Sequence, residues 1–557
     1  MVLWNNSLIH GISEWFSDKA SQSVTAERLE AFYYRPDPAE ASLYGRLLRL
    51  IGGMLLSVGS ILECSVFYGV ICWLKKLYFR ITENSFVFGA VNRISLHRWL
   101  LILFSLYLPV DWILRDVVKT AALSSVWDEI FMAVGIFLVL WRAALAQDRG
   151  RFMRATTVGA VLILYISVMF MLMMIVRPNT AIAVAGFRAQ VQYTLWFFII
   201  LRLIEDPGDA KTVLFCFAGL VFVLSLHGIY QFIIGVPIPA SWVTSSESGV
   251  RTRVFSIIGS PNLFGTLLVM AAPIPAALIY YLKKPLHKFL ALCATGCMCL
   301  CDLFTFSKAS WGALAITVII FAVFVDRRLL LALAAGVAGI LVAVPSIANR
   351  LTFIFSKEYE VASSIGGRAL RWATGRQLLA DSNPWLGFGL GRFGGAVAMN
   401  NQVIDTKDGF SYFYMDNYYL KTMVEAGYIG LLAFILLLVA FTVCGFKALQ
   451  RAGKGFAIDR TKDELFRNIG NDKLLAAALF SGMCGVMFHC YFENIFEQPY
   501  MMAYFWGLAA VLLSMGDVAK ERLDAELELG YRSGEENGWL DASSVLDRLE
   551  KKYHDMR

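Results

Sequence analysis

Long apolar stretches separated by short polar breaks run from residue 50 to residue 515. A stretch of about 20 predominantly apolar residues is long enough to cross a bilayer as a helix. Backbone that faces lipid must satisfy its own hydrogen bonds, so we expect helices rather than open sheet. The pattern predicts an all-α polytopic transmembrane bundle of about twelve spans, near residues 99–114, 123–142, 155–176, 189–204, 212–235, 262–282, 288–305, 309–325, 329–345, 418–445, 473–492 and 499–515.

The two ends of the chain differ from this core. Leu50–Leu74 is a further apolar stretch that contains Glu63 and ends at two lysines, so it either forms a thirteenth span or lies at the interface. Asn5–Ala20 has the pattern of a short amphipathic surface helix. The chain therefore divides into an N-terminal part at 1–98, a transmembrane core at 99–515 and a charged tail at 516–557.

The loop 346–417 is the longest connection between predicted spans, and aromatic residues are scattered through it. Because such a connection is either functional or disordered, the aromatic residues favour a folded element with short helices. Gly387, Gly389 and Gly391 predict a tight turn rather than nucleotide binding, since no strand precedes them. The loop carries seven cations, namely Arg350, Lys357, Arg368, Arg371, Arg376, Arg392 and Lys407. We interpret it as the roof of an active site.

Composition and charge agree with a membrane protein. With 58% hydrophobic and 17% charged residues, the chain is too apolar for a soluble protein. The formal charge of +7 comes from loop lysines and arginines and does not imply nucleic-acid binding. The positive-inside rule assigns the breaks at 149–154, 283–288, 327–328 and 447–473 to the cytoplasm, together with the C-terminus. The loops 235–261, 346–417 and 493–498 then face outward.

We expect no metal and no cofactor. Most of the ten cysteines lie inside apolar segments, where a thiol acts as a small hydrophobe. The cluster Cys293–Cys301 lacks a nearby histidine, so helix packing explains it better than zinc does. We find no acidic pair in the outward loops spaced to hold Mg²⁺.

Cations gather on the outward side. Arg251 and Arg253 end the first outward loop just before Gly259–Asn262 open a helix, so guanidinium and backbone N–H groups converge there. Lys308 lies between two apolar segments, and Arg368 and Arg371 share one face of a helix and can clamp one phosphate. Any one of these side chains can instead extend to lipid headgroups. Together they favour an anion site.

Two acidic residues are candidates for catalysis. Asp416 precedes a helix expected to start near Tyr418, where it is either a proton acceptor or an N-cap. Glu425 lies inside a predicted span, where an uncompensated charge is costly, so it is a functional candidate. It could equally pair with a structural arginine.

Over about residues 185–515 the chain resembles the superfamily of O-antigen ligases and O-antigen polymerases, membrane glycosyltransferases that move a glycan from undecaprenyl diphosphate to an acceptor. Four patches carry the resemblance: Arg253 with Ser260, Pro261, Asn262 and Gly265; Thr305–Gly312; Gly367, Arg368 and Trp372 leading to Pro384, Gly387 and Gly389; and Asp416, Asn417, Tyr418 and Leu420 with Glu425, Gly427 and Gly430. Family ligases carry histidine where this chain has Asp416, and arginine where it has Lys308. Aspartate can also accept a proton, and lysine can hold phosphate as a point charge.

The resemblance implies transfer of an undecaprenyl-diphosphate-linked oligosaccharide to a glycan, lipid or protein acceptor, on the extracytoplasmic face of a bacterial plasma membrane, with inversion at the anomeric carbon. The implied partners are this donor, the acceptor and membrane lipids. Arg253, Lys308, Arg368 and Arg371 would bind the diphosphate, and Asp416 would be the base, with Glu425 as a further catalytic candidate.

Two alternatives stay open from the sequence. A polysaccharide transporter or flippase would carry inverted repeats and broken midplane helices, and this chain has no internal repeat. A protein O-oligosaccharyltransferase of the same superfamily would differ only in its acceptor.

Orientation is directly testable. A cysteine placed at Thr406 should react with a membrane-impermeant maleimide in whole cells, because the loop 346–417 is predicted to face outward. A cysteine at Gly455, in a break predicted to be cytoplasmic, should react only after permeabilisation. Labelling at Gly455 in intact cells would reverse the predicted orientation.

Overall fold

The structure is a computed structural model that describes residues 37–82, 92, 94–145, 154–239, 252–343, 348, 352, 356–357, 367–402, 413–453 and 463–517. The amphipathic segment predicted over residues 5–20 and the tail beyond residue 517 lie outside this part. The described residues form helices and turns, and their only strand-like pairing is a bridge between Asn383 and Gly387. The predicted all-α class is confirmed.

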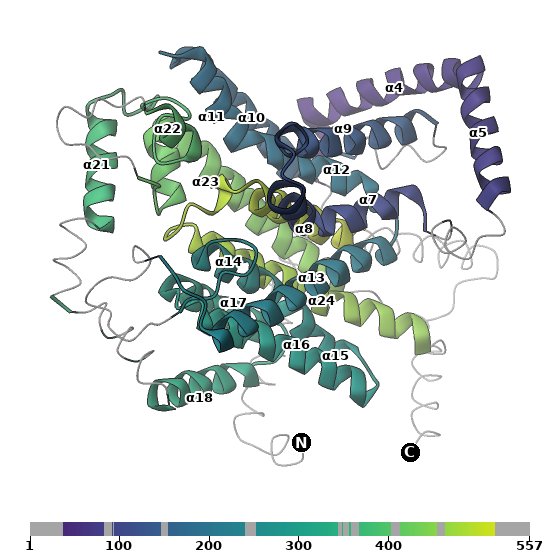
Figure 1. Ribbon diagram of the computed structural model, residues 1–557. Helices are drawn as coiled ribbons and strands as arrows, with labels where there is room; N and C mark the ends of the chain where they lie inside the picture. Colours follow the sequence, from purple (N-terminus) through teal and green to yellow (C-terminus); the bar gives the residue numbers. More distant parts are fainter. Residues whose placement is uncertain are drawn as a thin grey trace, which may run out of the picture.

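The helices follow one another along the chain in the order that the apolar pattern predicts (Figure 1). Their bounds are η1 Pro38–Ala41, α4 Leu43–Glu63, α5 Val66–Thr82, α7 Leu96–Ser105, α8 Tyr107–Trp112, η2 Ile113–Val118, α9 Ala121–Leu145, α10 Thr157–Ile175, α11 Thr180–Val191, η3 Gln192–Leu195, α12 Trp196–Leu203, α13 Pro207–Ile234, α14 Pro261–Ala271, α15 Pro273–Tyr281, α16 Pro285–Phe304, α17 Lys308–Phe324, α18 Arg328–Ala343, α21 Arg368–Ala380, α22 Ala396–Asn401, α23 Tyr418–Gly453, α24 Asp463–His489 and η6 Ile495–Glu497. A last helix, Pro499–Asp517, follows.

Many of these helices suit a membrane. Within the described ranges, eight are long and apolar enough to cross one: Leu43–Glu63, Thr157–Ile175, Thr180–Leu203, Pro207–Ile234, Pro261–Tyr281, Pro285–Phe304, Tyr418–Ala452 and Pro499–Asp517. Three shorter apolar helices, Leu96–Ser105, Lys308–Phe324 and Arg328–Gly339, fall at other predicted spans. The membrane class is therefore supported, and the total of about twelve spans stays a prediction.

Helix boundaries differ from the prediction where breaking residues intervene. The span predicted at 262–282 is two helices, α14 and α15, because Pro273 lacks the N–H that would continue the ladder. The stretch Leu50–Leu74 also belongs to two helices, since α4 ends at Glu63 and α5 begins at Val66. The loop 346–417 contains two short helices, α21 and α22, as predicted.

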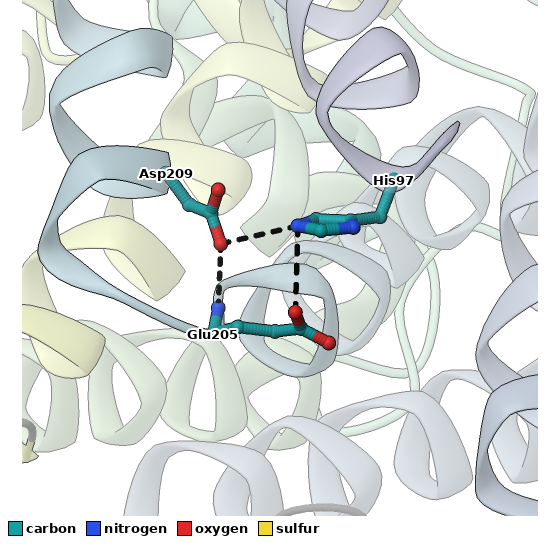
Figure 2. A group of neighbouring side chains, drawn as sticks. All are labelled: His97, Glu205 and Asp209. Atoms are coloured by element: carbon teal, nitrogen blue, oxygen red, sulfur yellow. Dashed lines mark hydrogen bonds and ion pairs between the residues drawn. The ribbon is translucent and has the colours of Figure 1, made fainter. Parts of the chain in front are cut away.

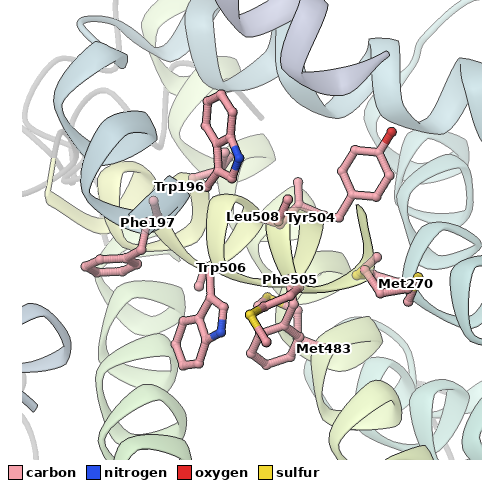
Figure 3. Packing of buried hydrophobic residues seen from close by; sticks show 14 of the residues in the cluster. Trp196, Phe197, Met270, Met483, Tyr504, Phe505, Trp506 and Leu508 are labelled. Carbon is pink, nitrogen blue, oxygen red and sulfur yellow. The ribbon is translucent and has the colours of Figure 1, made fainter. Parts of the chain in front are cut away.

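The last helix, Pro499–Asp517, lies at the centre of the bundle. It is apolar on all sides, which is the pattern of a helix surrounded by others. Figure 3 shows Phe505 and Trp506 of this helix packed among side chains of other helices, including Trp196, Phe197 and Met483. All of these side chains are buried. This core fixes the helices whose ends carry the polar residues described below.

Two of the breaks predicted to be cytoplasmic, 149–154 and 447–473, carry residues that form ion pairs at one end of the bundle. Asp517 pairs with Arg451 at 3.3 Å and with Arg154 at 3.7 Å, and Lys211 pairs with Asp472 at 3.1 Å. We call the region of these five residues the charged end. These ion pairs agree with the alternation of inside and outside breaks predicted from the sequence. The assignment of the charged end to the cytoplasm stays a prediction.

A break in α23 holds part of the long loop against the bundle. Gly427 has φ +66°, and the backbone around it forms hydrogen bonds with the loop. Phe388 N–H donates to Val424 O at 2.7 Å, and Tyr428 N–H donates to Pro384 O at 2.9 Å. Figure 1 shows α21 and α22 at one edge of the bundle, beside this end of α23.

Gly427 is therefore a sharp test of the fold. A β-carbon at Gly427 would lie 2.3 Å from the carbonyl oxygen of Trp385, in a left-handed backbone conformation that disfavours side chains. We expect Gly427→Ala to destabilise the protein by about 1–3 kcal/mol or more and to lower its melting temperature in detergent. Gly296→Ala is the matched control, because a β-carbon at Gly296 meets nothing within 4 Å. Equal melting temperatures would contradict the packing described here.

Candidate active site

Asp416 is held by three side chains of α21. Its Oδ2 accepts from Nε of Arg368 at 2.8 Å, and its Oδ1 accepts from the indole Nε1 of Trp372 at 3.0 Å. A guanidinium nitrogen of Arg371 lies 3.7 Å from the same Oδ2. Residues three and four apart on a helix share one face, which is why these donors reach one carboxylate. The predicted shared face of Arg368 and Arg371 is confirmed.

Asp416 does not cap the following helix. The side-chain oxygen of Asn417 accepts from the backbone N–H of Leu420 at 2.9 Å and so takes the capping role at the start of α23. The side chain of Asp416 faces the guanidinium groups instead. The capping alternative for Asp416 is therefore wrong.

Arg253 approaches from a second segment. Its side chain is buried, and it donates from Nε to Thr305 O at 2.9 Å and from a terminal nitrogen to Asn262 Oδ1 at 3.0 Å. Asn262 lies in the first turn of α14, where Ser260 is the N-cap and accepts from Leu263 N–H. The predicted convergence of Arg253 with this helix start is confirmed, and Arg251 lies outside the described residues.

The turn after α24 joins the two groups. Its Glu493 accepts from Nδ2 of Asn262 at 2.6 Å, and its Phe492 carbonyl accepts from Arg368 at 2.9 Å. Burial raises the pKa of the Glu493 carboxyl, while the hydrogen bond from Asn262 and the charge of Arg368 act in the opposite direction. Arg253, Asn262, Glu493, Arg368 and Asp416 thus form one connected cluster.

Lys308 stands next to this cluster. It is the first residue of α17, three positions after the carbonyl of Thr305 that accepts from Arg253. Phe306 between them has a left-handed backbone, φ +51°, which turns the chain sharply from α16 into α17. We call Arg253, Lys308, Arg368 and Arg371, with Asp416 and Glu493, the outward site. Four cations and two carboxyl groups leave it with a net positive charge.

Glu425 belongs to a different network. Its carboxylate is buried, lies 2.8 Å from Nζ of Lys421 and accepts from Gln190 at 2.7 Å and from the backbone N–H of Phe393 at 3.0 Å. Lys421 also pairs with Glu497 at 3.1 Å. The partner is a lysine rather than the arginine that we considered, and these contacts tie α11, α23 and the long loop together. The catalytic role expected of Glu425 stays a prediction.

The sequence alone did not assign a role in the site to three polar residues of this region. Asn262 and Glu493 link the cations, and His489 lies buried at the end of α24 with its Nδ1 2.8 Å from the hydroxyl of Thr266. Asn262 was part of a motif, but nothing in its spacing showed that it would bridge a cation and a carboxylate. Glu493 offered one signal, an acidic residue in a short outward turn between apolar segments.

A second polar cluster lies away from the outward site. Figure 2 shows His97, Glu205 and Asp209, whose ligand atoms are close enough together to hold a metal ion. Arg98 already donates to Asp209 at 2.5 Å, and Arg142 pairs with Glu205. These guanidinium groups neutralise the carboxylates. The cluster is therefore a set of ion pairs that links α7, α9 and the start of α13.

Comparison with known families agrees with the site. Residues 293–435 match the family described as O-antigen ligase, and this region includes Lys308, Arg368, Arg371 and Asp416. No curated protein matches the chain. This match supports the O-antigen ligase superfamily, and it confirms the resemblance over residues 293–435, which contain three of the four sequence patches.

Proposed function

We propose that the protein is a membrane glycosyltransferase that transfers an undecaprenyl-diphosphate-linked oligosaccharide to a glycan or lipid acceptor on the extracytoplasmic face. One observation carries this proposal: Arg253 and the α21 pair Arg368 and Arg371 come from two separate segments and are linked around two carboxyl groups. The match to the O-antigen ligase family supports the reaction class. The charge lies at helix ends rather than along a midplane path, which favours a surface reaction over transport.

The donor determines what the site must do. A sugar attached to a diphosphate is already activated, so catalysis requires stabilising the negative charge that grows on the leaving group. Fixed cations supply this without reorganisation, and Arg253 is fixed by its bonds to Thr305 and Asn262. Arg371 is 33% exposed, and its contacts with Tyr414 O and Asp416 are long, at 3.5 and 3.7 Å. It is therefore the cation best placed to turn toward a phosphate.

The acceptor hydroxyl must also lose a proton. Asp416 is the proposed base, as the sequence predicts, because it lies among the cations that would hold the leaving group. Glu493 is the second carboxyl of the site, and through Asn262 it positions Arg253. In this assignment one carboxyl takes the proton and the other orients a cation. No protein group forms a covalent bond to the sugar, which accords with inversion.

The cationic role can be tested on two residues. We expect Arg371→Ala and Arg253→Ala each to lower turnover by about 10²–10³ while folded protein is retained, since removal of one preorganised donor commonly has this effect. Lys308→Arg should retain or raise activity. Arg188→Ala is the control, because Arg188 pairs with Glu129 outside the outward site. Normal turnover in both test variants would contradict the phosphate-binding role and indicate that these cations contact lipid headgroups instead.

The proposed reaction is tested by replacing each carboxyl in a purified transfer assay. Asp416→Asn keeps size and most hydrogen bonding but removes the proton acceptor, so transfer of a lipid-linked oligosaccharide should fall by about 10²–10⁴ while donor binding survives. Asp416→His should restore part of the activity. Glu493→Gln keeps a carbonyl acceptor for Asn262 and should have a much smaller effect.

The opposite result would reassign the base. Because the pKa of Glu493 is raised, a Glu493 base would lose activity as the pH falls through a value above that of an ordinary glutamate, and Glu493→Gln would remove most turnover. An active Asp416→Asn enzyme would exclude Asp416. Wild-type protein that binds the lipid-linked donor without transferring it to any glycan or lipid acceptor would contradict the proposed function.

A further inference from the structure

Helix α4 begins at the charged end of the bundle. Asp37, just before η1, accepts hydrogen bonds from the N–H and the hydroxyl of Thr157 at 2.9 and 2.5 Å. Thr157 opens α10, three residues after Arg154, which belongs to the charged end. Leu48, in the second turn of α4, is buried in a small cluster with Ala155. The first half of α4 is therefore attached at this level of the membrane.

The C-terminal end of α4 lies on the same side of the bundle as its N-terminal end. Gly59 packs directly on the last turn of α9, where a β-carbon would lie 1.9 Å from the carbonyl oxygen of Ala144. Two residues earlier, Arg142 pairs with Glu205, in the short connection that leads to Lys211 of the charged end. The N-terminal part of α4 thus packs beside the start of α10, and its C-terminal part packs on the end of α9, two helix ends that lie near residues of the charged end.

This geometry is incompatible with a crossing helix. α4 has 21 residues and is about 30 Å long at 1.5 Å per residue, close to the thickness of the hydrocarbon layer. A helix of that length that crossed the bilayer would have one end at each surface. Although α4 is long and apolar enough to span, its contacts place it along the membrane plane.

The two faces of α4 fit this placement. Gly45, Leu48, Gly52 and Gly59 are buried against the bundle. Along the opposite side runs a stripe of exposed apolar residues at helical spacing, namely Leu43, Leu47, Leu50, Met54, Val58 and Ile61. Such a stripe needs an apolar environment.

Helix α5 continues the same pattern away from the bundle. Figure 1 shows it at the edge opposite α21, and Thr82 is its only buried residue in the described chain. A contact between Tyr68 and Trp141, with ring centroids 6.4 Å apart, ties its first turn to α9. Its exposed apolar side chains are Val66, Phe67, Val70, Trp73, Leu74, Phe79 and Ile81. Its second half also carries Lys75, Lys76 and Arg80.

We propose that α4 and α5 form an arm that lies in the membrane plane at the charged end and binds the anionic leaflet there. The apolar stripes enter the boundary between headgroups and acyl chains, and the α5 cations meet anionic headgroups. The cytoplasmic leaflet carries a negative surface potential that attracts such clusters of lysine and arginine. With the predicted orientation this is the leaflet that the arm contacts.

The first test determines on which side of the membrane the turn between α4 and α5 lies. In the full-length chain with Cys64→Ser, a cysteine at Ser65 lies between α4 and α5. We expect it to react with an impermeant maleimide only in permeabilised cells or inverted vesicles, on the same side as a cysteine at Gly455. Reaction in intact cells, on the side of a cysteine at Thr406, would mean that α4 crosses the membrane and would overturn the proposal.

The second test measures depth and lipid dependence in proteoliposomes. Nitroxide labels at Met54, Val70 and Trp73 should collide more with oxygen than with a polar nickel complex and lie at a shallow depth, while a label at Lys76 should show the reverse. In vesicles with phosphatidylglycerol, the label at Trp73 should lie deeper than in vesicles of phosphatidylcholine alone. Joint Lys75→Glu, Lys76→Glu and Arg80→Glu substitution should abolish that difference, whereas Arg188→Glu should leave it unchanged.

Two outcomes of this test would contradict the arm. A label at Met54 located at the bilayer centre would indicate a spanning helix. Labels at Val70 and Trp73 that are immobilised and shielded from both collision reagents would indicate that a protein surface, from a second copy or another partner, covers the stripe instead of lipid.

Discussion

The outward site depends on the pairing of buried and half-buried guanidinium groups with polar and carboxyl groups from distant parts of the chain. Arg253 and Arg368 lie far apart in sequence, yet Asn262, Glu493 and the carbonyl of Phe492 connect them. A charge taken out of water is costly unless it is paired and hydrogen-bonded, so each cation is stable there only with these partners. The same pairing keeps the donors fixed before any substrate arrives, which is the condition for stabilising charge in a transition state.

A second set of contacts holds the described part of the loop 346–417 against α23. The long loop returns to α23 at Gly427, and buried Glu425 accepts from the N–H of Phe393 while pairing with Lys421. Since Lys421 also reaches Glu497, the loop, α23 and the turn after α24 share one buried network. The catalytic role of Glu425 stays a prediction. Its contacts hold the loop that begins with α21, whose arginines and Trp372 surround Asp416.

The pattern of apolar stretches was sufficient to predict the helical class and the approximate place of most helices. In lipid, the backbone N–H and C=O groups must form their hydrogen bonds within the same segment. The helix start at Pro261 and the shared face of Arg368 and Arg371 were also predictable from local rules. The connection made by Glu493 was not, since it is a contact between residues 231 positions apart. The capping role of Asn417 rather than Asp416 was equally hidden, because both residue types cap well. The proposed in-plane placement of α4 depends on the contact of Gly59 with Ala144 and on the contact of Asp37, before α4, with Thr157, neither of which composition reveals.

The outward site is proposed to hold the diphosphate of a lipid-linked donor. The most direct measurement is an experimental structure of the full chain in a lipid nanodisc with undecaprenyl diphosphate bound. We predict diphosphate density in contact with Arg253 and Arg371, and Asp416 facing the position where the sugar would be attached. Density at the charged end, or between α7 and α13 beside His97 and Asp209, with the outward site unchanged, would contradict it.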